Sequence, residues 1–192
     1  MTDDGFESGP SQQATAGLLA KVQLLLDRQE IRDCVHRYAR GLNRHDDEVL
    51  ASAFHEDATF DYGAWTGKRD DFVQWANHLS VAHIAAGMHH ITSHTCTIEG
   101  DVAYAESYVL FVLRYKDPKT VQVGGGRYLD RLERREGVWR IAYRHHVLDN
   151  RFMVDGSVWG DWDGYVKGTQ DRDDASYAFP AVVPRELLDR LA

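Results

Sequence analysis

The chain has 192 residues, enough for one domain with a sizeable core. Hydrophobic residues make up 43% and charged residues 27%, the ordinary balance of a globular protein. The net charge of −8 argues against nucleic acid, whose phosphates need a basic face, and against an anionic membrane surface. No apolar run approaches the roughly 20 residues that a membrane-spanning helix requires.

The N-terminal segment and the cysteines indicate the compartment. Residues 1–16 are polar, lack the apolar stretch of a signal peptide and predict a disordered leader. Cys34 and Cys96 lie in apolar segments and form no CxxC pair, so we expect two core residues and no disulfide. A cytoplasmic location follows as the expectation.

Helices are predicted in the first half of the chain. Apolar residues recur every three to five positions over residues 16–42, as one buried stripe requires. A short helix is predicted over residues 48–54, and a third over residues 70–83. The segment 55–68 between them is expected to be a short strand flanked by turns.

From Met88 onward the apolar period changes from 3.6 to 2, which predicts strands. The four strands cover residues 89–99, 103–115, 120–134 and 138–150, and tight turns join them into an antiparallel meander. Helices followed by a meander predict an α+β fold, with the helices packed on one face of a curved, mainly antiparallel sheet. Residues 151–192 are expected to form an irregular C-terminal arm, whose Trp159–Trp162 cluster would cap a pocket or contact another subunit.

Two other features argue against familiar cofactor sites. The glycines at 124–126 lie inside a strand pattern with no helix after them, so they predict a bulge or a bend and no phosphate loop. The ten histidines include two adjacent pairs, but neighbouring strand residues point to opposite faces and cannot chelate one ion together. We therefore expect no metal and no cofactor.

Three segments carry a resemblance to a known family: YARGLNRHDDEVLASAFHEDATFDYG, MHHITSHTCTIEGDVAYAESY and GGRYLDRLERREGVWRIAYRHHVLD. Over roughly residues 20–150 the chain resembles the SnoaL-like branch of the NTF2-like superfamily. The resemblance implies a cone-shaped α+β barrel over residues 17–150, and a homo-oligomer in which a trimer is favoured over a dimer. Members of this branch include dehydratases, a dehydrochlorinase and lyases of diaryl compounds, whereas others are not enzymes, so the fold does not define the function.

The resemblance also implies site residues. Dehydratase-like members use an Asp–His pair, and the matching positions are Asn43 and His90. Tyrosines of two such enzymes match Tyr38 and Tyr62. Strand positions of the family pocket correspond to Arg144, His146, Leu148, Tyr128 and Val112, and Trp65 is expected to bind substrate with them.

Alternation along the last predicted strand does not decide which of its two faces points inward. One face would carry Ile141, Tyr143, His145 and Val147, and the other Arg140, Ala142, Arg144, His146 and Leu148. The first set is more apolar and could be the core face. The resemblance implies that the second set faces inward. A buried arginine and a buried histidine would be costly without a function, so this set would belong to a site.

The resulting hypothesis is a cofactor-independent lyase for a small hydroxylated aromatic or cyclic compound. His90 would take a proton, Tyr62 or Tyr38 would assist the departing oxygen, and Arg144 would steady negative charge. The reaction would be elimination of water, or carbon–carbon cleavage that releases formaldehyde. A proton-shuttling isomerase is another form of the enzyme hypothesis. Asn43, an amide where relatives have a carboxylate, supports a different alternative, a ligand-binding or assembly module without catalysis.

Overall fold

The fold is a single sheet backed by helices. The computed structural model describes residues 10–117, 119–157, 164–178 and 189–190. The elements run α1 (Pro10–Arg44), α2 (Asp47–Ser52), β1 (Phe54–Asp61), β2 (Thr66–Lys68), α3 (Arg69–His83), β3 (Ile84–Glu99), β4 (Val102–Tyr115), β5 (Thr120–Arg135), β6 (Val138–Asp155) and a 3₁₀ helix (Ala175–Ala178). The strand order is β2-β1-β6-β5-β4-β3, and every pair is antiparallel except β1 with β6. The predicted α+β class with a mainly antiparallel sheet is confirmed.

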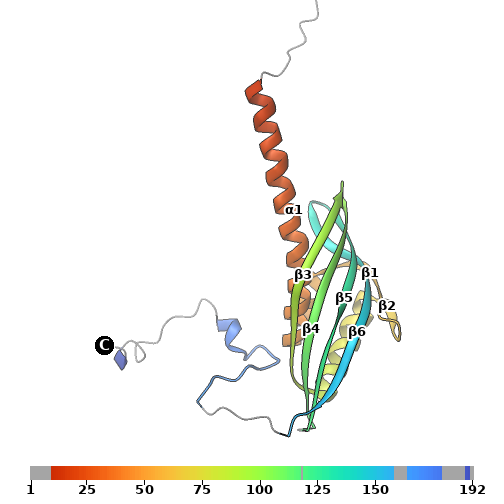
Figure 1. Ribbon diagram of the computed structural model, residues 1–192, viewed down its shortest axis with the longest axis vertical. Coiled ribbons are helices and arrows are strands. Elements are labelled where there is room, and N and C mark those ends of the chain that lie inside the picture. Colours follow the sequence, from red (N-terminus) through yellow and green to blue (C-terminus); the bar gives the residue numbers. More distant parts are fainter. Residues whose placement is uncertain (1–9, 118, 158–163, 179–188, 191–192) are drawn as a thin grey trace, which may run out of the picture.

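The core lies between the helices and one face of the sheet (Figure 1). The C-terminal half of α1 and the helix α3 cover this inner face, and they bury an aromatic and aliphatic cluster against β1, β5 and β6. The largest buried side chains of the cluster are Trp139, Tyr38, Phe54, Phe72 and Ile31. Removal of this apolar surface from water is the main favourable contribution to the fold.

The start of α1 corrects the expected leader. The helix begins at Pro10, inside the segment predicted to be disordered, and residues 1–9 lie outside the described residues. Its N-terminal half projects past the sheet (Figure 1) and leaves Leu18, Leu19 and Leu25 more than 60% exposed. In the described part of the chain, no helix is long and apolar enough to cross a membrane.

The end of β6 corrects the expected arm. The strand continues to Asp155, five residues past the predicted boundary, because Thr120–Gly124 of β5 pair with Arg151–Asp155. The arm from Gly164 to Ala178 then returns to α1 and ends in the 3₁₀ helix. The Trp159–Trp162 cluster lies outside the described residues.

Bulges change which side chains face the core. One register shift falls between Arg131 and Leu132 of β5, so that Ile141 and Arg144, three residues apart on β6, are both fully buried. Neither predicted face of this strand is therefore correct as a whole. The second shift falls between Gly125 and Gly126, which confirms the bulge predicted at the glycine run.

Candidate active site

A cavity of about 450 Å³ opens between α1, α3 and the inner face of the sheet. Aromatic and aliphatic side chains form most of its wall, and polar groups gather at two places along it. Its lining includes Tyr38, Tyr62, Phe72, Trp75, His89, Phe111, Gln122, Tyr128, His146, Leu148 and Arg151. An apolar cavity with a few converging polar groups is the usual form of a small-molecule site.

An amide–imidazole pair lies at one side of the cavity. Asn43, near the end of α1, accepts hydrogen bonds through Oδ1 from the backbone N–H of His89 at 3.1 Å and from its ring Nδ1 at 2.7 Å. Because the same atom accepts the backbone N–H, it is the oxygen, and the ring proton therefore sits on Nδ1. The unprotonated Nε2 of His89 is then free to accept a proton.

Burial, followed by the nearby His146 and His90, lowers the pKa of His89 to about 4. The imidazole is therefore neutral at neutral pH. A carboxylate in place of Asn43 would oppose this shift, whereas the amide orients the ring without supplying charge.

The histidine of the predicted pair is His89 and not His90. His90 is exposed and turned away from the cavity, because successive residues of β3 point to opposite faces. The prediction for Val112 is wrong by one residue in the same way. Val112 pairs with Met88 on the outer face, and its neighbours Phe111 and Leu113 line the cavity. The apolar Ile91, two residues after His89 and packed against the core, was a sequence signal for the correct face.

Three tyrosine hydroxyls meet in the wall of the cavity. The hydroxyl of Tyr38 lies 3.1 Å from that of Tyr62 and donates to that of Tyr128 at 3.3 Å. Burial raises the pKa of Tyr62 and of Tyr128 well above the ordinary value, and Arg144 only partly offsets this. Both hydroxyls therefore remain protonated and can donate hydrogen bonds.

Arg144 lies behind these tyrosines and does not line the cavity. Its side chain is fully buried and binds Asp130 through Nε at 2.7 Å and Nη2 at 2.8 Å. The guanidinium carbon is 4.1 Å from the ring centres of both Tyr38 and Tyr128. Although burial disfavours its charge, the pair with Asp130 raises the pKa of Arg144 above the ordinary value. Arg144 is thus a permanent positive charge under the hydroxyl cluster.

The remaining predicted residues are divided between the wall and the layer behind it. His146 lies against the rings of Tyr62 and Tyr128, and burial followed by Arg144 lowers its pKa to about 4. Leu148 lines the cavity near it. Trp65 stacks on the wall residue Trp75 at 5.0 Å, so it supports the cavity without lining it. The resemblance did not single out Trp75, Gln122 or Arg151, because their apposition depends on α3 and the extended β6.

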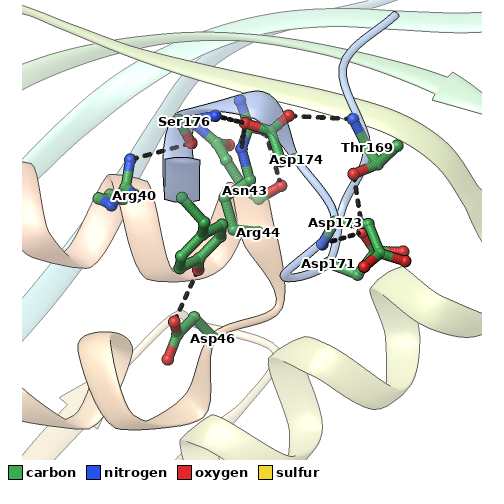
Figure 2. A network of polar contacts seen from close by, with 10 residues as sticks. Arg40, Asn43, Arg44, Asp46, Thr169, Asp171, Asp173, Asp174 and Ser176 are labelled. Atoms are coloured by element: carbon green, nitrogen blue, oxygen red, sulfur yellow. Dashed lines mark hydrogen bonds and ion pairs between the residues drawn. The ribbon is translucent and has the colours of Figure 1, made fainter. Parts of the chain in front are cut away.

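The C-terminal arm docks beside Asn43 (Figure 2). Tyr177 donates to Asp46 at 2.6 Å, and Arg44, adjacent to Asn43, pairs with Asp174 at 3.2 Å. Hydrogen bonds from Ser176 hold the pKa of Asp174 well below the usual range. The arm therefore braces the corner of α1 that carries the Asn43 amide.

Among residues that the structure describes, no group of three or more histidine, cysteine or acidic side chains could hold a metal ion. Cys34 and Cys96 are both free thiols.

The fold and the cavity together define a helix-backed α+β domain with a largely apolar cavity of small-molecule size. The family model for the SnoaL-like domain matches residues 23–145, so the chain belongs to the SnoaL-like family of the NTF2-like superfamily. A search of curated protein sequences gives no significant match.

Solved structures share this fold. Rv3472, a protein of unknown function from Mycobacterium tuberculosis, is 29% identical, with a TM-score of 0.58 over 66% of this chain and 78% of its own. A candidate scytalone dehydratase from Novosphingobium aromaticivorans is 18% identical, with a TM-score of 0.63 over 74% of this chain and 99% of its own. A hexachlorocyclohexane dehydrochlorinase, LinA type 3 from Novosphingobium barchaimii, is 19% identical, with a TM-score of 0.68 over 74% of this chain and 99% of its own.

Proposed function

We propose that the protein is a cofactor-independent lyase acting on a small hydroxylated aromatic or cyclic compound. The observation that carries the proposal is that the neutral imidazole of His89 and the protonated hydroxyl of Tyr62 line one aromatic cavity. A proton acceptor and a proton donor facing the same bound molecule are what an elimination requires. The dehydratase and dehydrochlorinase among its structural neighbours share the fold and are consistent with elimination chemistry.

In the proposed step, Nε2 of His89 takes a proton from a substrate carbon. The electron pair of that C–H bond forms the new double bond, and the neighbouring C–O bond breaks. The departing hydroxyl takes a proton from the tyrosine cluster and leaves as water. Return of the proton from the imidazolium to the tyrosinate, through water, restores both groups.

Arg144 contributes to this step through the tyrosines and not by contact with the substrate. Its guanidinium lies against the rings of Tyr38 and Tyr128, and its charge favours a tyrosinate. Because Arg144 is fully buried, its charge acts at low dielectric and stabilises the transition state more than it would in solution. In the deformylating variant, the same base takes the proton of a hydroxymethyl O–H and the C–C bond breaks to release formaldehyde. The electron pair of that C–C bond forms the new double bond, and the neighbouring C–O bond breaks to give water with a proton from the tyrosine cluster.

A comparison of two adjacent histidines tests the proposal. Hydroxylated aromatic, steroid and polyketide compounds are incubated with the protein, and loss of water or formaldehyde is followed by mass spectrometry. With an active compound, His89→Gln is expected to lower kcat by about 10²–10⁴-fold, the usual contribution of a general base. His90→Gln, one residue away on the outer face, is the matched control and is expected to leave kcat unchanged. Equal effects of the two changes contradict the mechanism.

A ligand-binding or assembly module without catalysis is the second candidate function, because of the Asn43–His89 pair. An imidazole with a pKa of about 4 is a weak base, and Asn43 cannot stabilise its charged form. Binding of aromatic compounds without any turnover across the screen favours this module. An isomerase would instead return the proton to a different carbon and give a product of unchanged mass.

A further inference from the structure

We infer that the ligand of this cavity is an anion whose carboxylate, or equivalent anionic oxygen group, binds Arg151 at the end remote from the tyrosine cluster. The inference rests on the proposed function for the reacting end, and it concerns the opposite end of the same cavity. It assigns Arg151 as the residue that selects the charge of the substrate.

The extended part of β6 places Arg151 in the cavity wall. Arg151 pairs with Gly124 across the sheet, beyond the bulge at Gly125 and Gly126. The bulge inserts Asp149 as an extra residue, so that Arg151 shares the inner face with His146 and Leu148. A side chain on Gly124 would meet the ring of Phe111 at 2.3 Å, so glycine there lets this ring pack over the strand beside Arg151.

The charge of this cavity is unusual for a protein with a net charge of −8. None of its described lining residues is an aspartate or a glutamate. Asp130, which lies behind the wall, is bound by Arg144, and Asp149 is bound by Arg127 on the outer face. The titratable groups that do face the cavity are His83, His89, His146, Tyr38, Tyr62, Tyr115, Tyr128 and Arg151.

Arg151 has no acidic partner in the described part of the chain. Arg151 is exposed at the mouth of the cavity, and its one hydrogen bond among these residues is a weak one, from Nη2 to the sulfur of Met153 at 3.9 Å. Most arginines of this sheet are paired, as Arg127 and Arg131 are. A guanidinium that borders an apolar cavity and lacks a carboxylate is suited to bind one from a ligand, with two parallel hydrogen bonds.

A second donor lies beside it. Gln122, 8% exposed, accepts a hydrogen bond from Tyr115 at 2.7 Å through its side-chain oxygen. Its amide nitrogen has no partner among the described residues and lines the same end of the cavity. Arg151 and Gln122 together present hydrogen-bond donors, which an anionic oxygen group accepts.

The spacing along the sheet indicates the length of the ligand. Arg151 is opposite Gly124 and His146 is opposite Tyr128, so four residues of β5 separate the two ends. At about 3.3 Å per residue this is about 13 Å along the strand. His89 lies in the same row across the sheet as Phe111, Gly124 and Arg151, so three strand spacings, about 14 Å, separate Arg151 from His89. A molecule of two linked rings spans much of either distance, with its acid at Arg151 and its reacting carbon beside His89 and Tyr62.

A matched pair of probes tests the inference without any need for turnover. Biphenyl-4-carboxylate and biphenyl-4-carboxamide have nearly the same shape and differ in charge. Calorimetric titration of the full chain is expected to show at least about tenfold tighter binding of the acid, since a charge-assisted bidentate pair replaces a neutral contact. Arg151→Gln is expected to abolish this preference while affinity for the amide stays within about twofold, and Arg151→Lys is expected to retain part of it.

Arg114→Gln is the control for net charge. Arg114 lies at the same end of the sheet, but its neighbours Leu113 and Tyr115 line the cavity and so it points to the outer face. This variant is expected to keep the preference for the acid. The inference is overturned if the acid binds no more tightly than the amide, if neither binds, or if Arg151→Gln leaves the ratio unchanged. A preference that depends on Arg151 in a protein without lyase activity would support this inference and count only against the proposed function.

Discussion

At the scale of single residues, Asn43 determines which ring nitrogen of His89 can accept a proton. Its oxygen accepts both the backbone N–H and the ring Nδ1–H of His89, and this orients a basic Nε2 toward the cavity. An amide orients the ring as well as a carboxylate would, but it leaves the pKa of His89 at about 4. His89 is therefore in its proton-accepting form at every pH above about 4.

Asn43→Asp is expected to raise the pKa of His89, because the carboxylate favours the imidazolium form. The midpoint of the His89 ring signal in an NMR titration should move upward from about 4. With an active substrate, the acidic limb of kcat/KM should move to higher pH by the same amount, because protonation removes the base. A midpoint that stays in place or falls would show that the residue at 43 does not control His89.

The family resemblance identified several of the residues that line this cavity. Tyr38, Tyr62, Tyr128 and His146 were all assigned to the cavity, and all four line it. The predictions of His90 and Val112 were each one residue away from a residue that lines the cavity. In a strand a shift of one residue reverses the face, so a small alignment error exchanges a cavity residue for an outer one.

At the scale of elements, the bulge between Gly125 and Gly126 shapes the cavity. A side chain on Gly126 would meet the carbonyl oxygen of Val147 at 2.2 Å and Nε2 of His146 at 3.2 Å. Backbone cannot give way as a flexible side chain can, so this position requires glycine.

Gly126→Ala is expected to lower the free energy of unfolding by about 1–3 kcal/mol, as overpacking does. Gly17→Ala is the matched control, because nothing lies within 4 Å of its added carbon in α1. It should raise the free energy of unfolding by up to about 1 kcal/mol through helix propensity. Urea denaturation measures both changes, and a similar effect of the two would contradict the role of the bulge.

The docked arm is a second element whose contacts can be tested. Asp46 is 4% exposed and receives hydrogen bonds from Tyr177 and from the backbone of Val49. Tyr177→Phe removes one donor from a buried carboxylate, which costs about 1–3 kcal/mol of arm docking. Because cleavage follows the population of the undocked arm, trypsin is expected to cut after Lys167 and Arg172 about fivefold to a hundredfold faster in this variant.

Asp173→Asn is the control for this experiment. Asp173 is exposed on the same turn of the arm, and only its backbone N–H forms a hydrogen bond. Trypsin should cut the Asp173→Asn protein at the same rate as the unchanged protein. Equal rates for all three proteins would mean that the Tyr177–Asp46 contact does not hold the arm.

At the scale of the whole molecule, the outer face of the sheet carries large exposed apolar side chains beside the ion pairs of Arg127. Alternate residues of β4 point away from the core and leave Tyr104, Tyr108 and Leu110 between 44% and 51% exposed, and Phe152 of β6 is 60% exposed. Exposed apolar surface of this kind is typical of an interface.

We propose that the chain forms a homo-oligomer through this face, with a trimer favoured over a dimer. Sedimentation equilibrium is expected to give a multiple of the 21.9 kDa chain mass. Leu110→Glu should lower that mass by placing a charge in the interface. Val166→Glu, in the arm and 86% exposed, should leave it unchanged. A monomer under all conditions would contradict the proposal.

The sequence by itself determined the order of elements, the fold class and the chemical types that the site contains. Hydrophobic period and turn residues are local signals, so helices, strands and the bulge at Gly124–Gly126 could be read from them. Only the tertiary structure decided that His89 faces Asn43, that Arg144 lies buried behind the tyrosines, and that Arg151 borders the cavity. Each of these depends on strand register and bulges, which are set by pairing between segments far apart in the chain and leave little trace in any one of them.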